Sequence, residues 1–138
     1  FKVLNKTELR SFQIKEIVTK GDSKINFLIK NNLINNFSRS KANESALLNI
    51  SSTKNKEIKE KNIKNQITKY KISLICNLKI NVLSNGKIFN KSLSTTSDYQ
   101  VALNYSTTLN NEKKITDTLI NNVSEKILDE INLVLNDL

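Results

Sequence analysis

The chain has 138 residues, 38% of them hydrophobic, which is enough for one core and one domain. It lacks His and has one Cys and two Gly, which excludes a zinc site, a Cys-His pair, a Ser-His-Asp triad and a glycine-rich phosphate loop. We therefore expect no enzyme, no metal and no cofactor. The formal net charge of +9 favours an anionic partner, but an AT-rich coding bias also produces such heavy use of Lys, Asn and Ile.

The first part of the chain predicts a strand and then a helix. Residues 1–10 start with apolar Phe-Lys-Val-Leu and continue as a polar linker, so we place the single domain at 11–138. Apolar residues in 12–18 predict a short strand, and the Gly-Asp-Ser at 21–23 ends it and offers a helix N-cap. From 24 to about 39, apolar residues recur at helical spacing. They are Ile25, Leu28, Ile29, Leu33 and Phe37.

The next part predicts a strand that runs into a charged segment. A polar joint at 40–45 precedes Leu48 and Ile50, which begin an alternating pattern. The segment 54–66 is charged, and Ile58 and Ile63 are its only apolar residues. Such a run is typical of a solvated loop or an extended hairpin tip. The alternative is a projecting basic tip that meets an anion.

A central strand is predicted at 70–82, where every second residue is apolar. These residues are Tyr70, Ile72, Leu74, Cys76, Leu78, Ile80 and Val82. Because successive side chains of a strand point to opposite faces, the segment has one apolar face and one mostly wet face. Cys76 falls on the apolar face, so we expect a small buried hydrophobe rather than a reactive thiol.

A hairpin is predicted at Asn85-Gly86, between two alternating runs. Asn-Gly in this context is typical of a two-residue type I′ turn, which fixes the strand register. This register places Leu78 opposite Leu93, with both under the helices. The same face pairs Val82 with Phe89, Ile80 with Lys91, Ile72 with Tyr99 and Tyr70 with Val101.

The last part of the chain predicts a long amphipathic helix. Beyond Tyr105, apolar residues recur at steps of three and four. Asn110 or Thr107 can cap its start, and Glu112 is expected in the first turn, where the helix dipole favours an acid.

These elements predict an α+β fold. Two helices pack on one face of a four-stranded sheet that is antiparallel, or mixed at most, in the order β-α-β-β-β-α. The other face of the sheet is expected to be polar and uncovered. It carries Ser73, Asn77, Lys79, Asn81, Ser92 and Ser94.

Several short sequences carry a resemblance to a known family. They are Thr-Lys-Tyr-Lys-Ile-Ser-Leu at 68–74, the Asn-Gly hairpin, Ser-Asp-Tyr-Gln-Val at 97–101, Tyr105-Ser106 and a closing helix with Leu119, Val123 and Ile127. Over about 68–133 the chain resembles the lipopolysaccharide-assembly lipoprotein LptE, of the alphaproteobacterial type. Lys69 departs from the family pattern, which often has Arg there, and this weakens the case for bidentate phosphate recognition at that point.

The resemblance implies an outer-membrane lipoprotein on the periplasmic side. Such a protein is a plug inside the β-barrel LptD, assists the folding of that barrel and helps to deliver lipopolysaccharide to the cell surface. Phe-Lys-Val-Leu at 1–4 resembles the segment just after the lipidated cysteine and glycine of mature members, so the lipid anchor is expected outside this chain. Candidates for the lipopolysaccharide contact are Lys69, Lys71 and Lys79, because all three share the wet face of one strand.

Two other functions remain open from the residues alone. One is a periplasmic adaptor that binds another protein through its sheet face or edge, without a lipid ligand. The other is a nucleic-acid-binding sheet, which ranks last because Tyr70, Phe89 and Tyr99 fall on the core face instead of forming an exposed stacking platform. We therefore expect no nucleic acid. No stretch reaches the roughly 18 consecutive apolar residues that a membrane span requires.

Overall fold

The computed structural model describes residues 12–37 and 44–136. Its elements are β1 (Phe12–Gly21), α2 (Ser23–Phe37), β2 (Glu44–Lys61), β3 (Ile67–Val82), β4 (Ile88–Gln100) and α3 (Tyr105–Asn136). The α+β class and the order β-α-β-β-β-α are confirmed. The predicted linker at 1–10 and most of the joint at 40–45 lie outside the described residues.

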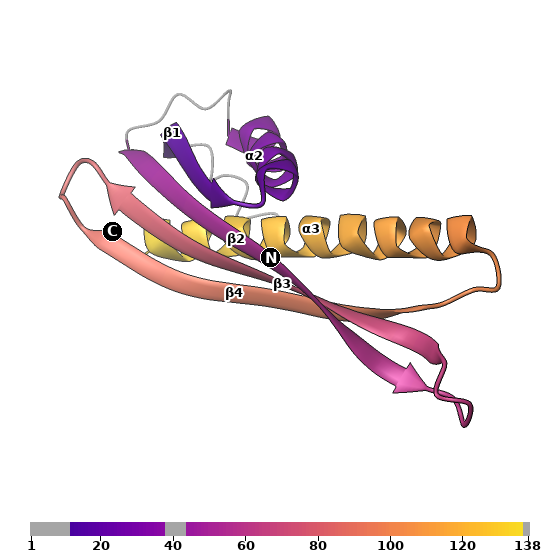
Figure 1. Cartoon of the computed structure of the whole chain (residues 1–138). Helices are drawn as coiled ribbons and strands as arrows, with labels where there is room; N and C mark the ends of the chain where they lie inside the picture. Colours follow the sequence, from indigo (N-terminus) through magenta and orange to yellow (C-terminus); the bar gives the residue numbers. More distant parts are fainter. Residues whose placement is uncertain (1–11, 38–43, 137–138) are drawn as a thin grey trace.

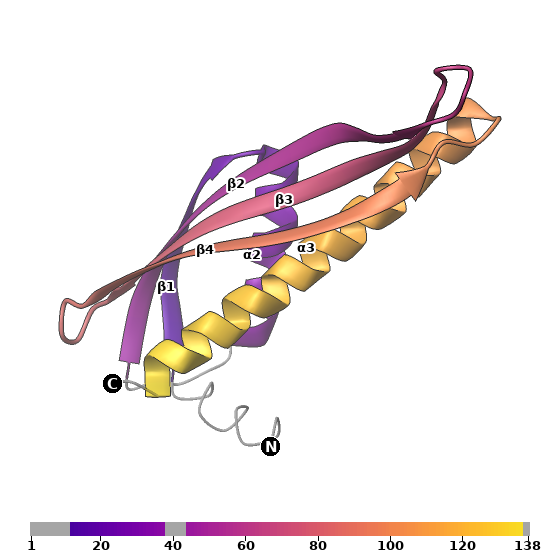
Figure 2. The ribbon, with the colours of Figure 1, turned by 90° about the horizontal axis from the view of Figure 1, so that it is seen from below.

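The four strands form one mixed sheet in the order β1-β2-β3-β4. β1 is parallel to β2, and the other two pairs are antiparallel. A parallel pair needs a crossover connection, and α2 lies on that connection. Both helices cover the same face: α2 packs over β1 and β2, and α3 runs along β3 and β4 (Figures 1 and 2). No described residue outside the sheet covers its opposite face, which we call the open face.

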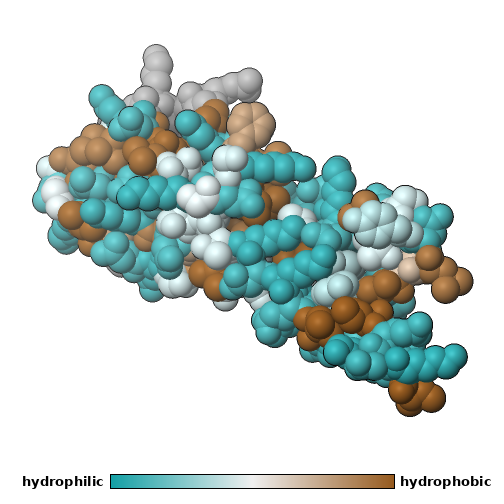
Figure 3. Space-filling view, in the orientation of Figure 1, coloured by the Kyte–Doolittle hydropathy of each residue, from teal (hydrophilic) through white to brown (hydrophobic). Residues whose placement is uncertain are grey.

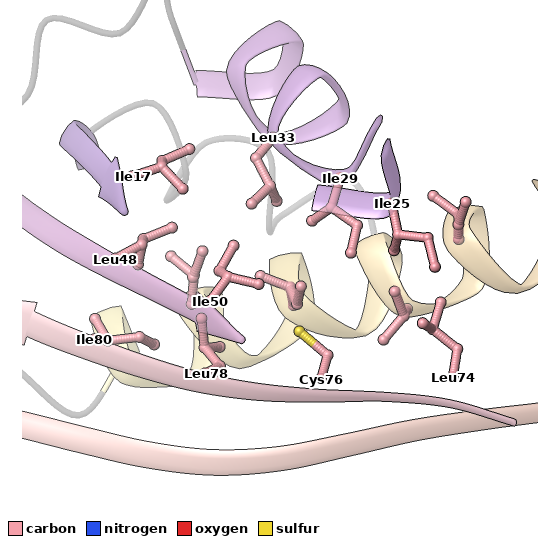
Figure 4. Packing of buried hydrophobic residues seen from close by; sticks show 14 of the residues in the cluster. Ile17, Ile25, Ile29, Leu33, Leu48, Ile50, Leu74, Cys76, Leu78 and Ile80 are labelled. Carbon is pink, nitrogen blue, oxygen red and sulfur yellow. The ribbon is translucent and has the colours of Figure 1, made fainter. Parts of the chain in front are cut away.

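The core lies between the helices and the predicted apolar face of β3. Six of the seven predicted residues of that face, all but the half-buried Tyr70, are at most 2% exposed. They pack against buried residues of both helices, among them Ile25, Ile29 and Leu33 of α2 (Figure 4). Cys76 is fully buried among them, and burial raises the pKa of its thiol to about 11. The prediction that Cys76 is a buried hydrophobe is confirmed.

The helix starts are fixed by side-chain caps. Asp22 Oδ1 accepts a hydrogen bond from Ile25 N (3.0 Å), so the predicted N-cap of α2 is confirmed. The predicted cap of α3 is wrong: the helix starts at Tyr105, and Asn104 Oδ1 accepts the bond from Ser106 N (2.8 Å). Glu112 consequently lies two turns into the helix, away from the first-turn position that we expected.

The predicted register of the β3–β4 hairpin is wrong by two residues. Leu78 lies opposite Lys91, and Leu93 lies opposite Cys76. The loop has four residues, 83–86, because Val82 N donates to Lys87 O (2.9 Å). A type I′ turn needs positive φ at both central residues, and only the glycine of the Asn-Gly pair has it (φ +71°). A slip of two preserves the side-chain alternation, so the predicted faces of both strands are confirmed.

β2 is longer than the sequence pattern suggested. Its 18 residues continue through the charged segment, which is an extended hairpin with its tip at 62–66. β1 ends much earlier, at Gly21, which lies opposite Ser52. Gly21 has φ +96°, and a Cβ there would lie 2.0 Å from Ser52 O, so only glycine fits. Beyond this point the sheet narrows to three strands.

Candidate anion-binding surface

The far end of the β2–β3 hairpin holds much of the positive charge of the chain. Residues 53–71, which we call the basic arm, contain seven lysines and two glutamates, a net charge of +5 against +9 for the whole chain. The arm projects beyond β1 and α2 (Figure 1). At this end of the molecule hydrophilic side chains lie beside a group of hydrophobic ones (Figure 3). The fold extends this charged segment as an arm at one end of the domain.

A polar cluster ties the arm to α3. The carboxylate of Glu112 accepts hydrogen bonds from Tyr99 Oη (2.9 Å), Lys54 Nζ (3.1 Å) and Lys56 Nζ (3.2 Å). Lys56 Nζ also lies 4.4 Å from the ring centroid of Tyr70, which stacks on Tyr99 with centroids 5.6 Å apart. One carboxylate thus faces two ammonium groups, and the cluster keeps one net positive charge.

The cluster holds its charges at neutral pH. Burial raises the pKa of the Glu112 carboxyl, but hydrogen bonds from Tyr99 and the two lysines outweigh it, so this pKa lies below its ordinary value. The pKa of Lys56 is raised, mainly by its contact with Tyr99 and also by Glu112. Burial, followed by the bond to Glu112, raises the pKa of the Tyr99 phenol. Glu112 and Lys56 are therefore charged at neutral pH, and Tyr99 is neutral.

The remaining lysines of the arm differ in whether they form an ion pair. Lys71 Nζ lies 3.8 Å from a carboxylate oxygen of Glu57, and Lys59 Nζ lies 4.0 Å from Asp98. Three others make no ion pair within the described part of the chain. They are Lys61, Lys64 and Lys69. These three, close to the tip, are the cations of the arm that are available to an external anion.

The structure separates the three lysines that the sequence singled out. Lys69, Lys71 and Lys79 all lie on the open face of β3, as predicted. Lys69 and Lys71 belong to the basic arm. Lys69 has one acid as a cross-strand neighbour, Glu60, and Lys71 has two, Glu57 and Asp98. Lys79 is eight residues further along the strand, about 27 Å at the usual rise. The three therefore do not form one site.

Lys79 borders a second cationic region. A shallow groove of about 420 Å³ lies on the open face across all four strands. Its polar lining includes Lys20, Lys79, Asn49, Asn77, Asn90 and Ser92. Among the described residues this face is therefore uncovered and mainly polar, as predicted, and Val18 of β1 is an exposed apolar residue on it.

Sequence reasoning missed two kinds of functional residue. It did not select Lys61 and Lys64, although the charged run 54–66 was their signal and suggested a basic tip. It assigned Glu112 to a helix start, because its partners lie 56 and 58 residues away and no local pattern reveals them. Within 12–37 and 44–136, no three metal-binding side chains come close enough to hold an ion. In those same ranges no helix has the length and apolarity of a membrane span.

The fold and this surface define a class: a domain with one helix-covered and one open, polar sheet face, and a projecting basic hairpin. No known family model matches the chain, and no curated protein matches its sequence. Solved structures of bacterial lipoproteins do match. Rare lipoprotein B from Shewanella oneidensis is 11% identical, with a TM-score of 0.64 over 89% of this chain and 98% of that one.

Two further structures give the same result. A minor lipoprotein from Acinetobacter baumannii is 15% identical, with a TM-score of 0.63 over 91% of this chain and 94% of that one. Uncharacterized lipoprotein B from Nitrosomonas europaea is 9% identical, with a TM-score of 0.67 over 91% of this chain and 85% of that one. At these identities the likeness shows the fold, and the chain has the fold of these lipoproteins.

Proposed function

We propose that the chain is a lipopolysaccharide-assembly lipoprotein of the LptE kind, without enzymatic activity. The observation that carries the proposal is the fold shared with rare lipoprotein B, another name for LptE, over most of both chains. The sequence resemblance over about 68–133 supports it independently. In this role the protein is anchored by lipid to the outer membrane, faces the periplasm and plugs the β-barrel LptD.

The surface suits such a plug. A domain inside a water-filled barrel needs a polar outer surface, and the open sheet face offers amides, hydroxyls and lysines across four strands. The apolar faces of the sheet and helices that pack against each other form the core of the domain. The plug is then held by a large, mostly polar interface in which no single charge dominates.

The basic arm suits the phosphorylated headgroup of lipopolysaccharide. Lys61, Lys64 and Lys69 form no ion pair with the described residues, although Glu60 lies opposite Lys69, so their ammonium groups can meet phosphate. Lys71 contributes less because Glu57 partly neutralises it, and Lys79 would meet a separate part of a large ligand. Exposed contacts of this kind are individually modest and are weakened by salt.

The test separates lipid binding from barrel association. A variant with Lys61, Lys64 and Lys69 all changed to Gln is compared with a control that loses the same charge elsewhere, at Lys24, Lys30 and Lys114. The arm variant is expected to bind lipopolysaccharide several-fold more weakly in low salt and still to co-purify with the barrel. Equal binding by both variants would remove the arm from the lipid site, and a wild-type chain that never co-purifies with the barrel would overturn the proposed function.

A further inference from the structure

The outer edge of β2 beyond Ser52 has no neighbouring strand among the described residues. We propose that residues 53–58 accept an extended, acidic segment of another protein chain as an added β-strand. This inference goes beyond lipopolysaccharide assembly and does not depend on it. Figure 2 shows the position, where β2 continues as the outermost strand after β1 has ended.

The hydrogen-bond pattern identifies which backbone groups face this edge. Ser45 O accepts from Leu83 N on the β3 side (2.9 Å), and Ser52 O accepts from Asp22 N on the other side (3.3 Å). In an antiparallel pair these directions alternate residue by residue. The groups of Lys54, Lys56 and Ile58 therefore point outward. They offer three N–H donors and three C=O acceptors to an incoming strand.

The chain cannot fill this edge with β1. Gly21 and Asp22 turn the backbone into α2, and Asp22 N bonds to Ser52 O at the point where β1 ends. At its other end the free edge is limited by irregular pairing between Ile58 and Lys61, which leaves one regular segment of six residues. Six residues are enough for a short added strand.

The opposite edge of the sheet is partly occupied by side chains of α3. Along β4, Lys126 Nζ donates to Ser94 O (2.9 Å) and Asn111 Nδ2 donates to Gln100 O (3.1 Å), so side chains of α3 occupy outward carbonyls. No side chain of the described residues does this for Lys54 or Lys56. The contrast identifies the β2 segment as a site for strand addition.

The side chains specify an acidic occupant. Those of Lys54 and Lys56 lie on the helix side, where two ammonium groups share the one carboxylate of Glu112. A partner residue opposite them is therefore acidic, and a partner residue opposite Ile58, whose side chain is 51% exposed, is apolar. Lysines at an edge resist pairing with neutral or basic strands, and the same charges favour an acidic one.

A second copy of the chain fits this edge poorly. If the segment pairs with itself antiparallel and with matching faces, the centre of symmetry can lie on any residue from 54 to 57. Each of these registers sets like charges opposite each other: Lys54 with Lys54, Lys54 with Lys56, Lys56 with Lys56, or Glu57 with Glu57. The charge pattern thus favours a different chain.

Amide hydrogen exchange with two synthetic peptides tests the proposal. One blocked peptide contains Val-Thr-Glu-Thr-Glu, which in an antiparallel pair sets Val opposite Ile58 and Glu opposite Lys56 and Lys54, and the other has Lys in place of both Glu residues. In low salt the Glu peptide is expected to slow exchange at the amides of Lys54, Lys56 and Ile58 by about fivefold or more, because these amides become hydrogen-bonded. The Lys peptide is expected to leave them unchanged. No slowing by the Glu peptide, or equal slowing by both, would overturn the proposal.

Two variants at one position sharpen the test. Ile58→Pro removes an outward N–H and spares the ladder to β3, whereas Ile58→Thr keeps that N–H. The Glu peptide is expected to protect Lys54 and Lys56 in the Thr variant and to lose most of this protection in the Pro variant. Full protection in the Pro variant, or protection of the same amides by self-association without peptide, would contradict the assignment. The two-peptide comparison on the unchanged chain stands even if the Pro variant fails to fold.

Discussion

The two halves of β2 follow the same alternation but are stabilised differently. Before Ser52, the residues that face the helices are Ala46, Leu48 and Ile50, all at most 2% exposed. After Ser52, the same face carries Lys54 and Lys56, which reach one carboxylate on α3. The first half is held by burial of apolar surface, and the second half by a polar cluster at the surface.

The change between the halves coincides with a polar joint. Ser52 is buried, and its hydroxyl donates to Asn26 Oδ1, while Asn26 Nδ2 donates to Lys20 O (2.8 Å). This joint connects the end of β1, the start of α2 and the middle of β2. Beyond it α2 no longer covers the sheet, so apolar side chains would remain in water. β2 continues as a strand beyond Ser52, but α2 no longer covers it there. This loss of helix cover explains why its sequence becomes rich in lysine.

We call the part of the sheet that lies under both helices, up to Ser52 of β2, the covered half. Disrupting it has the largest expected effect on stability. Leu78→Asp places a carboxylate among buried apolar side chains, where its cross-strand neighbour Lys91 is exposed and already paired with Glu130, and is expected to lower the free energy of unfolding by about 4 kcal/mol. Asn77→Asp, one residue away on the open face, is expected to stay within about 1 kcal/mol. Urea unfolding of both variants checks this, and similar midpoints would refute the assignment of faces.

Breaking the polar cluster has a smaller and more local effect. Glu112→Gln keeps the shape of the side chain but leaves Lys54 and Lys56 without their carboxylate. We expect a loss of about 1–2 kcal/mol, mostly as easier opening of the arm, because hydrogen bonds to charged groups contribute on that scale. Asp117→Asn is the control, since the one ion pair that Asp117 forms with the described residues is with the exposed Lys113 on the same helix. An equal loss in both variants would mean that the cluster does not hold the arm.

Acid is expected to destabilise the arm before it destabilises the covered half. The pKa of Glu112 is lowered in the folded chain, so its contribution to stability is present above its ordinary value of 4.5 and disappears as pH falls through the lower folded value. The arm is therefore expected to loosen in acid before the covered half unfolds. Tyrosine fluorescence can follow Tyr70 and Tyr99 during the titration. An unchanged acid transition in Glu112→Gln would contradict this source of the pH dependence.

Neutralising the tip has the smallest expected effect on stability. Changing Lys61, Lys64 and Lys69 to Gln removes no described ion pair, so the free energy of unfolding should stay within about 0.5 kcal/mol. A thermal melt of the same variant used for lipid binding measures this. A large drop in melting temperature would show that these lysines have structural partners, and reduced binding could then not be assigned to charge.

The sequence predicted the covered half better than the arm, for physical reasons. Alternation along 70–82 defines the two faces because burial demands it, but it cannot distinguish registers that differ by two residues. The register depended on whether Asn85-Gly86 forms a two-residue turn, and the chain uses a four-residue loop instead. In the arm both faces meet water, so β2 has no apolar alternation after Ser52 to mark it as a strand.

The site was only partly predictable for a similar reason. Lys69 and Lys71 could be placed on one face by counting along the strand. The neutralisation of Lys71 by Glu57 and the cluster at Glu112 arise from contacts across strands and layers. These contacts exist only once the correct register and helix position are known.

The central claim is that burial stabilises the covered half and the polar cluster stabilises the arm. Residue-resolved hydrogen exchange of the native chain tests it most directly. The amides of Asn55, Glu57 and Lys71, which bond between β2 and β3, are expected to open at lower free energy than those of β3 between 74 and 80. Glu112→Gln is expected to lower the opening free energy of the first group alone. Equal opening free energies in the two groups, or an equal fall in both with Glu112→Gln, would contradict the claim that burial holds one half and the polar cluster holds the other.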